Sequence, residues 1–273
     1  MRPIPKHGGF TLVELVTVII ILGIVSIGVS GFIKSGVQIY HDVTERDQLL
    51  SESRFVVERL KRELRSALPN SVRVAKTSAT QCIQFVPIRW ATYYTTLPVL
   101  PATDTQVNVV DITDASGQFL LQDGDFAVVY PTSDADVYDT GHNKRHPITQ
   151  CTLSSCIIAP GDANLSRFTV DSGFADISPA SRLYIVREAI SYCVTGNKIY
   201  RQQDLITPVQ PLLSSGVLMA QHLSNNLSSS AELPFTVNVP TLNRNALVQV
   251  FLAFENNDEI VNYSQDIHIP NAP

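Results

Sequence analysis

The residue most suggestive of chemistry is Glu14, which stands alone in an apolar segment. A basic leader with Arg2 and Lys6 precedes it, and residues 10–33 carry no other charge. A segment of this length can span a bilayer, which takes about 20 apolar residues. A carboxylate inside such a helix costs about 2–3 kcal/mol at mid-bilayer and marks a functional site by default. We therefore expect Glu14 to have a partner.

Four cysteines form the second candidate set, and all of them follow the apolar segment. The basic leader places the N-terminus in the cytoplasm, so the long C-terminal part lies outside it. An even number of cysteines in an oxidising space indicates two disulfides, with three possible pairings. Cys151 and Cys156 are the easiest pair to close by a tight turn. We predict this bridge together with Cys82–Cys193, although the sequence leaves the pairing open.

Two histidines near the second cysteine pair superficially resemble part of a zinc site. His142 and His146 are followed by Cys151 and Cys156. Zinc sites commonly use closely spaced cysteines, whereas these two are separated by four residues. In an oxidising compartment we favour a disulfide beside two solvent-facing histidines over a zinc site.

Residues 130–150 are polar and rich in aspartate, and we predict that they form an exposed loop. Asp134, Asp136 and Asp139 could offer oxygen ligands to calcium. The segment lacks the glycine and the closing glutamate of an EF-hand loop. A solvated acidic loop without a metal is the preferred interpretation, and calcium binding stays open.

The sequence gives little support for a catalytic function or for nucleic-acid binding. The sequence contains no Gly-x-Ser-x-Gly elbow, no phosphate-binding glycine loop with lysine and no His-Glu-x-x-His helix. We expect no enzyme activity and no cofactor. The 273 residues carry a net charge of −5, which argues against nucleic-acid binding by bulk electrostatics.

The elements that position these residues are one long helix and a β-rich body. Apolar residues at helical spacing continue past the apolar segment as far as Pro69, which predicts a helix from Phe10 to near Ala67. Residues 10–36 are its apolar half and residues 37–68 its amphipathic half. Residues 69–273 form short β-rich runs. We predict an α+β fold with the helix packed on an antiparallel sheet, and no shift in composition demands a second folded domain.

Two turns are predicted within the β-rich body. Thr195-Gly196-Asn197 is typical of a tight hairpin. The last two runs, 246–254 and 260–269, are expected to form a C-terminal hairpin that closes the sheet. Trp90, Tyr93 and Tyr94 are expected to pack in a strand rather than to form a recognition patch.

The stretch Gly8-Gly9-Phe10-Thr11-Leu12-Val13-Glu14 resembles the processing site of type IV prepilins and type II secretion pseudopilins. This resemblance implies that a prepilin peptidase removes residues 1–9 by cutting after Gly9, and that Phe10 becomes an N-methylated terminus. It implies that Glu14 meets the terminal amine of a neighbouring subunit. It also implies the type IV pilin fold, an inner-membrane precursor with a periplasmic body, and later an extracellular pilus.

Softer features suggest a subtype. Residues 54–65 resemble J-type pseudopilins and W-type minor pilins, while residues 251–254, Val261 and the ending 265–273 look like the MshO minor pilins of the mannose-sensitive haemagglutinin pilus. The implied function is a low-abundance subunit that primes pilus assembly near the tip and supports surface attachment. Its partners would be other minor pilins and the major pilin. The alternatives are a tip adhesin and a J-type subunit of a type II secretion system.

Overall fold

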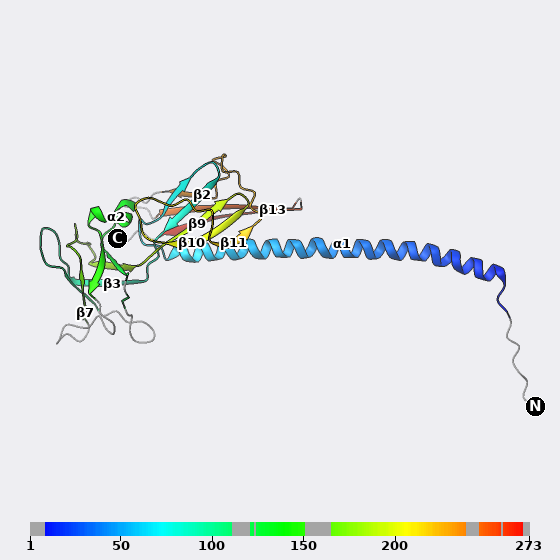
Figure 1. Ribbon diagram of the computed structural model, residues 1–273, viewed down its shortest axis with the longest axis horizontal. Coiled ribbons are helices and arrows are strands. Elements are labelled where there is room, and N and C mark those ends of the chain that lie inside the picture. Colours follow the sequence, from blue (N-terminus) through cyan, green and yellow to red (C-terminus); the bar gives the residue numbers. More distant parts are fainter. Residues whose placement is uncertain are drawn as a thin grey trace, which may run out of the picture. The chain divides into compact units, whose positions relative to one another are not determined.

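The computed structural model describes residues 9–110, 121–122, 124–150, 165–238, 246–257 and 259–269. The chain divides into two compact units, Met1–Leu50 and Ser51–Pro273. The long helix α1 (Leu12–Arg65) begins in the first unit and ends in the second. Antiparallel sheets follow it, so the fold is α+β, consistent with the type IV pilin fold (Figure 1).

The remaining elements lie in the second unit, here called the body. Its helical turns are α2 (Asp134–Tyr138) and η1 (Thr140–His142). Its strands are β1 (Arg73–Lys76), β2 (Thr80–Phe85), β3 (Trp90–Thr96), β4 (Gln106–Val110), β5 (Phe126–Val128), β6 (Arg145–Gln150), β7 (Leu165–Val170), β8 (Arg182–Val186), β9 (Ala189–Thr195), β10 (Lys198–Asp204), β11 (Val217–Gln221), β12 (Phe235–Asn238), β13 (Ala246–Asn256) and β14 (Glu259–Ile269).

Helix α1 has the extent predicted from the sequence to within about two residues at each end. Its last turn tightens, because Ser66 donates to the Glu63 carbonyl over 3.1 Å and Ala67 to the Leu64 carbonyl over 3.1 Å. Such bonds satisfy carbonyls that an ordinary helix end leaves unpaired. Pro69 then disfavours helical geometry at the residue before it.

The two parts of α1 differ in what covers them. Large apolar side chains from Phe10 to Val43 are exposed, and the helix is long and apolar enough to cross a membrane. Within the body, Val56, Leu60 and Leu64 are fully buried. This change follows the sequence, which is apolar all round at first and amphipathic afterwards.

A five-stranded antiparallel sheet in the order β1-β2-β9-β10-β11 is hydrogen-bonded to the end of α1. The turn Thr195-Gly196-Asn197 joins β9 to β10, as predicted, and Gly196 adopts a positive φ of 57° there. Strands β2 and β9 are paired side by side although about a hundred residues separate them in the sequence.

Six strands that lie between β2 and β9 in the sequence form a closed barrel in the order β3-β4-β7-β6-β5-β8. The barrel has its own core, which includes Val107, Phe168, Phe174 and Leu183. The predicted long helix followed by antiparallel β-structure is confirmed, but the β-structure is divided between two open sheets and a barrel rather than forming one sheet. Strand patterns are the same whichever sheet a strand joins, so they do not show that β8 and β9, within one apolar run, belong to different sheets.

The C-terminal hairpin of β13 and β14 is present as predicted, with a register that runs from Ala246↔Ile269 to Asn256↔Glu259. It does not close the five-stranded sheet. Instead it pairs with β12 in a separate three-stranded sheet, β12-β13-β14. Trp90 and Tyr94 pack against the barrel core from β3, as predicted, whereas Tyr93 is 53% exposed, so the predicted packing was wrong for Tyr93.

Residues 130–150 do not form the expected exposed loop. They contain α2, η1 and β6, and Asp136, Tyr138 and His146 are buried. The Ser133 hydroxyl accepts the Asp136 N–H over 3.3 Å, and the Asp136 carboxylate accepts the Ser133 N–H over 3.0 Å. This reciprocal cap uses the acidic residue to start a helix, so Asp136 is not a solvated aspartate.

Candidate functional site

The N-terminus of α1 carries the candidate site, and its first turn is a capping box. Thr11 precedes the first helical residue, and its hydroxyl accepts the Glu14 N–H over 3.3 Å. The Glu14 carboxylate Oε2 accepts the Thr11 N–H over 3.4 Å and the Thr11 hydroxyl over 3.2 Å. Two backbone donors that the helix start leaves unpaired are thereby satisfied reciprocally.

This geometry gives Glu14 a local function that sequence reasoning missed. The carboxylate lies at the helix N-terminus, where the helix dipole favours a negative charge. Both bonds described to the Glu14 carboxylate reach one oxygen, Oε2, while a carboxylate offers two oxygens with about four acceptor positions. Glu14 can therefore cap its own helix and still accept an added cation. The Thr-x-x-Glu spacing before an apolar run is the signal that could have revealed the cap.

The predicted cleavage position lies just before this turn. Gly9 and Phe10 are exposed and outside regular secondary structure, and Phe10 is 88% exposed. A Cβ added at Gly9 would meet nothing within 4 Å. Residues 1–8 of the predicted leader lie outside the described residues. The Gly9–Phe10 peptide bond is thus open to a peptidase.

A second charged cluster ties the body to α1. Glu63 accepts Arg201 Nε at 3.1 Å on Oε1 and at 3.0 Å on Oε2, and Arg59 Nε at 3.0 Å. The Tyr192 hydroxyl of β9 donates to Glu63 over 3.0 Å. Since Arg201 lies on β10, one carboxylate joins the helix to two neighbouring strands. We call Glu63, Arg59, Arg201 and Tyr192 the helix–sheet lock.

The protonation of the lock follows from its burial and its bonds. Burial by itself would raise the pKa of Glu63, but hydrogen bonds from Arg201 and Arg59 outweigh it and hold the pKa below its ordinary value. Burial, reinforced by the charge of Glu63, raises the pKa of the Tyr192 hydroxyl. Tyr192 therefore stays a neutral donor, and Glu63 stays an anionic acceptor, at neutral pH.

The predicted cysteine pairs divide between described and undescribed residues. Cys82 and Cys193 form a disulfide with a Cα–Cα distance of 4.1 Å between register partners on β2 and β9. Cys151 and Cys156, the other predicted pair, lie outside the described residues.

Candidate metal ligands serve other purposes in the structure. Within the described ranges, no group of three or more His, Cys, Asp or Glu side chains could hold a metal ion. His142 pairs with the capping residue Asp136 at 2.8 Å, and its side chain is 45% exposed. The side chain of His146 is only 4% exposed and pairs with Asp171 at 2.7 Å, so the prediction of two solvent-facing histidines was wrong for His146.

A comparison with known protein families finds a match at the N-terminus. The family model of the prokaryotic N-terminal methylation motif matches residues 4–30, which include Gly9, Phe10 and Glu14. No curated protein and no solved structure matches the chain. The motif supports a type IV pilin-like protein and implies processing by a prepilin peptidase and assembly with other pilins. Together with the apolar helix, it fits membrane anchoring followed by pilus assembly, and it suggests a structural subunit.

Proposed function

We propose that this chain is a minor subunit of a type IV pilus that helps to start fibre assembly near the tip. The observation that carries the proposal is the methylation motif at residues 4–30, which leads into an exposed apolar helix with Glu14 in its first turn. Residues 1–9 are the leader, 10–36 the membrane and polymerisation part of the helix, 37–68 its amphipathic part and 69–273 the β-rich globular part. The MshO-like C-terminal features favour a subunit of the mannose-sensitive haemagglutinin pilus.

In this proposal cleavage after Gly9 creates a charged amine at Phe10, which the peptidase methylates. The amine of one subunit then pairs with Glu14 of a neighbour within the apolar bundle. An opposite charge a few ångströms away favours the ionised forms of both groups. The capping bonds to Oε2 leave Oε1 of Glu14 available to that amine. Breaking a buried pair by removing one partner costs about 3–5 kcal/mol, so the pairing is selective for processed subunits.

Processing is the direct test. The chain is produced in cells with and without a prepilin peptidase, and the N-terminal peptide is identified by mass spectrometry. We expect a methylated Phe10 terminus only when the peptidase is present. Gly9→Ala keeps a small side chain and should still permit some cleavage, whereas Gly9→Leu should block it. An intact Met1 in both strains, or cleavage at another bond, contradicts the proposal.

A J-type subunit of a type II secretion system is the neighbouring possibility, because processing and membrane insertion are the same in both systems. The genes beside this one distinguish them. Genes for a pilus assembly ATPase and a major pilin favour the pilus, and genes for a secretin with secretion pseudopilins favour the secretion system.

A second candidate function, a tip adhesin, is favoured by the barrel. The barrel is inserted between two strands that already pair with each other, so neither the five-stranded sheet nor its contacts with α1 need it for connectivity. The barrel has a core cluster of its own, and assembly by the helix alone does not explain this additional structure. Attachment assays with a barrel-deleted chain separate the two functions.

A further inference from the structure

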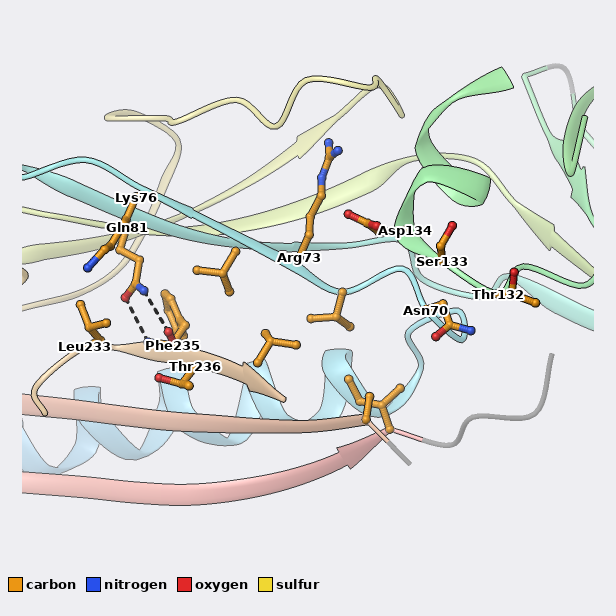
Figure 2. A pocket seen from close by; sticks show the side chains of 15 residues that line it. Asn70, Arg73, Lys76, Gln81, Thr132, Ser133, Asp134, Leu233, Phe235 and Thr236 are labelled. Carbon is orange, nitrogen blue, oxygen red and sulfur yellow. Dashed lines mark hydrogen bonds between the residues drawn. The ribbon is translucent and has the colours of Figure 1, made fainter. Parts of the chain in front are cut away.

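A groove of about 560 Å³ lies in the body between β1 and β12 (Figure 2). Its wall is mainly apolar, with Val72, Val74, Phe235, Val237 and Ile269 among the lining residues. β1 is an outermost strand of the five-stranded sheet and β12 an outermost strand of the three-stranded sheet, so both are edge strands. Edge strands expose unpaired backbone groups and are templates for further strands.

The register of β12 shows which of its backbone groups face the groove. The Phe251 N–H of β13 donates to the Pro234 carbonyl over 2.9 Å. Because backbone groups alternate in direction along an antiparallel strand, Thr236 and Asn238 pair with β13, while Phe235 and Val237 point away from it. The free edge of β12 therefore presents the backbone of Phe235 and Val237.

The protein itself places a peptide-like group against this edge. The side-chain amide of Gln81 donates to the Phe235 carbonyl over 2.9 Å and accepts the Phe235 N–H over 3.1 Å. Gln81 is 1% exposed, so this pairing is built into the fold. A primary amide with one donor and one acceptor bond imitates a neighbouring strand. Val237, the next outward-facing residue, has no backbone partner among the described residues, and it lines the open part of the groove.

Opposite charges stand at the two ends of the groove. Lys76 is exposed and is the register partner of Gln81, at the end where β12 begins. Asp134, the first residue of α2, lies at the other end, toward which β12 points (Figure 2). Arg73 also lines the groove and interacts electrostatically with Asp134, while its guanidinium donates to the Gln84 side chain and to the Thr207 and Pro208 carbonyls. An extended ligand that matches these charges has an acidic residue beside Lys76 and a basic residue beside Asp134.

We propose that this groove binds an extended peptide segment of a partner protein, which adds to β12 as an antiparallel strand. Its backbone pairs with Val237, continuing the pattern that Gln81 begins at Phe235. Apolar side chains at alternate positions pack on Val72 and Val74. Because an antiparallel segment runs from the Asp134 end to the Lys76 end, its basic residue precedes its acidic residue. The site uses neither Gly9 nor Glu14 and does not depend on the function proposed above.

The test uses the full chain in lipid nanodiscs, because detergent could fill an apolar groove. The probe is a fluorescent peptide, acetyl-Lys-Val-Thr-Val-Thr-Val-Glu-amide, followed by fluorescence anisotropy. One control has the same side chains with N-methylated valines, and a second exchanges the terminal Lys and Glu. We expect the N-methylated peptide to bind about tenfold more weakly, since the backbone bonds are lost. The charge-exchanged peptide should bind about threefold more weakly.

Two variants place the binding site. Val237→Pro removes the outward N–H of β12 and should weaken binding of the first peptide by about tenfold. Its matched control is Ser264→Pro on β14, whose N–H also points outward because its register partner Phe251 bonds to Pro234. Lys76→Glu, at an exposed side chain that leaves the core intact, should reverse the preference between the two charged peptides. Hydrogen exchange should show the Val237 amide unprotected in the free chain and protected with the peptide.

Several results overturn the proposal. Absence of binding overturns it. Binding whose affinity is unchanged by N-methylation, by Val237→Pro and by Lys76→Glu also overturns it, because such binding is apolar adsorption. Protection of Val237 in the free chain that disappears when residues 270–273 are deleted would assign the groove to the chain's own terminus. Protection that rises with protein concentration would assign it to a second copy.

Discussion

At the residue scale, Glu14 combines two functions that a single substitution can separate. It caps the first turn of α1 through Thr11, and in the proposed fibre it pairs with a neighbour's amine. Glutamine keeps the oxygen that accepts the Thr11 N–H but removes the charge, whereas alanine removes both. Loss of a cap costs about 1 kcal/mol.

We therefore expect Glu14→Gln to keep the helix start and to lose association with partner pilins. Glu14→Ala should lose both, and Thr11→Ala should weaken the helix start while association persists. Amide exchange at the first turn and co-purification with the other subunits measure the two effects. Wild-type association of Glu14→Gln would mean that the charge makes no assembly contact.

Glu63 is the corresponding residue in the body, and its protonation makes stability depend on pH. Its pKa in the folded chain is below the ordinary 4.5. The stabilisation is therefore complete above the ordinary pKa and is lost as the pH falls through the lowered value. Asp136, whose pKa is also lowered, contributes in the same direction.

Glu63→Gln should destabilise the body by about 2 kcal/mol at neutral pH, because bonds to a charged acceptor become bonds to a neutral one. The difference from the wild type should shrink in acid, where Glu63 itself is protonated. Urea unfolding at about pH 7 and about pH 3.5 measures both free energies. An equal difference at the two pH values would show that the charge of Glu63 does not stabilise the helix–sheet lock.

At the element scale, the disulfide between β2 and β9 closes the chain around the barrel. Cys82 and Cys193 are 111 residues apart in the sequence. A crosslink over such a loop restricts the unfolded chain and stabilises by about 5 kcal/mol in the chain-entropy account. The strand pairing from Thr80↔Thr195 to Phe85↔Ile190 does not need the bridge, so a reduced body can keep its fold.

We expect Cys82→Ser combined with Cys193→Ser to lower the free energy of unfolding by about 5 kcal/mol without changing the circular dichroism of the native state. Cys151→Ser combined with Cys156→Ser is the comparison, and it should cost less because its loop is short. Peptide mapping without reductant identifies the bridges. A link between Cys82 and Cys151 would contradict the predicted pairing.

The elements also show which parts of the fold are readable from sequence. Pro69 ends α1, and Gly196 supplies the hairpin turn, because both act through their own backbone and need no distant partner. The assignment of β8 to the barrel and β9 to the sheet depends on pairing with residues far away. Asp136 appeared to be a solvated acid because its hydrogen-bond partners arise only once α2 forms.

The candidate site divides in the same way. Gly9, Phe10 and Glu14 stand in a local motif, so their proposed functions could be inferred from spacing. The helix–sheet lock was not predicted, because Glu63 and Arg201 are 138 residues apart and only the folded sheet brings them together. The groove beside β12 likewise depends on which strands become edges.

At the scale of the whole molecule, the barrel is connected to the rest of the body at the ends of β2 and β9. Phe85 and Ile190 are the last register partners there. A buried cluster joins the two parts, with Leu68 and Ile206 on the sheet side and Val128 and Tyr138 on the barrel side. Removal of the barrel should therefore lower stability while leaving the strand order of the five-stranded sheet intact.

This arrangement permits a test of assembly against attachment. A variant in which Asn-Gly joins Val86 directly to Ala189 replaces the barrel by a two-residue hairpin loop, a favoured connection between paired strands. It keeps the methylation motif, Glu14 and the helix–sheet lock.

If the helix and sheet suffice for priming, the variant restores surface fibres in a deletion strain. If the barrel binds a surface, those fibres fail to attach. Electron microscopy counts the fibres, and adhesion to a glycan-coated surface and to glass measures attachment, with immunoblots confirming equal amounts of each chain. Loss of fibres despite equal amounts would place the barrel in assembly, and wild-type attachment would remove the adhesin function.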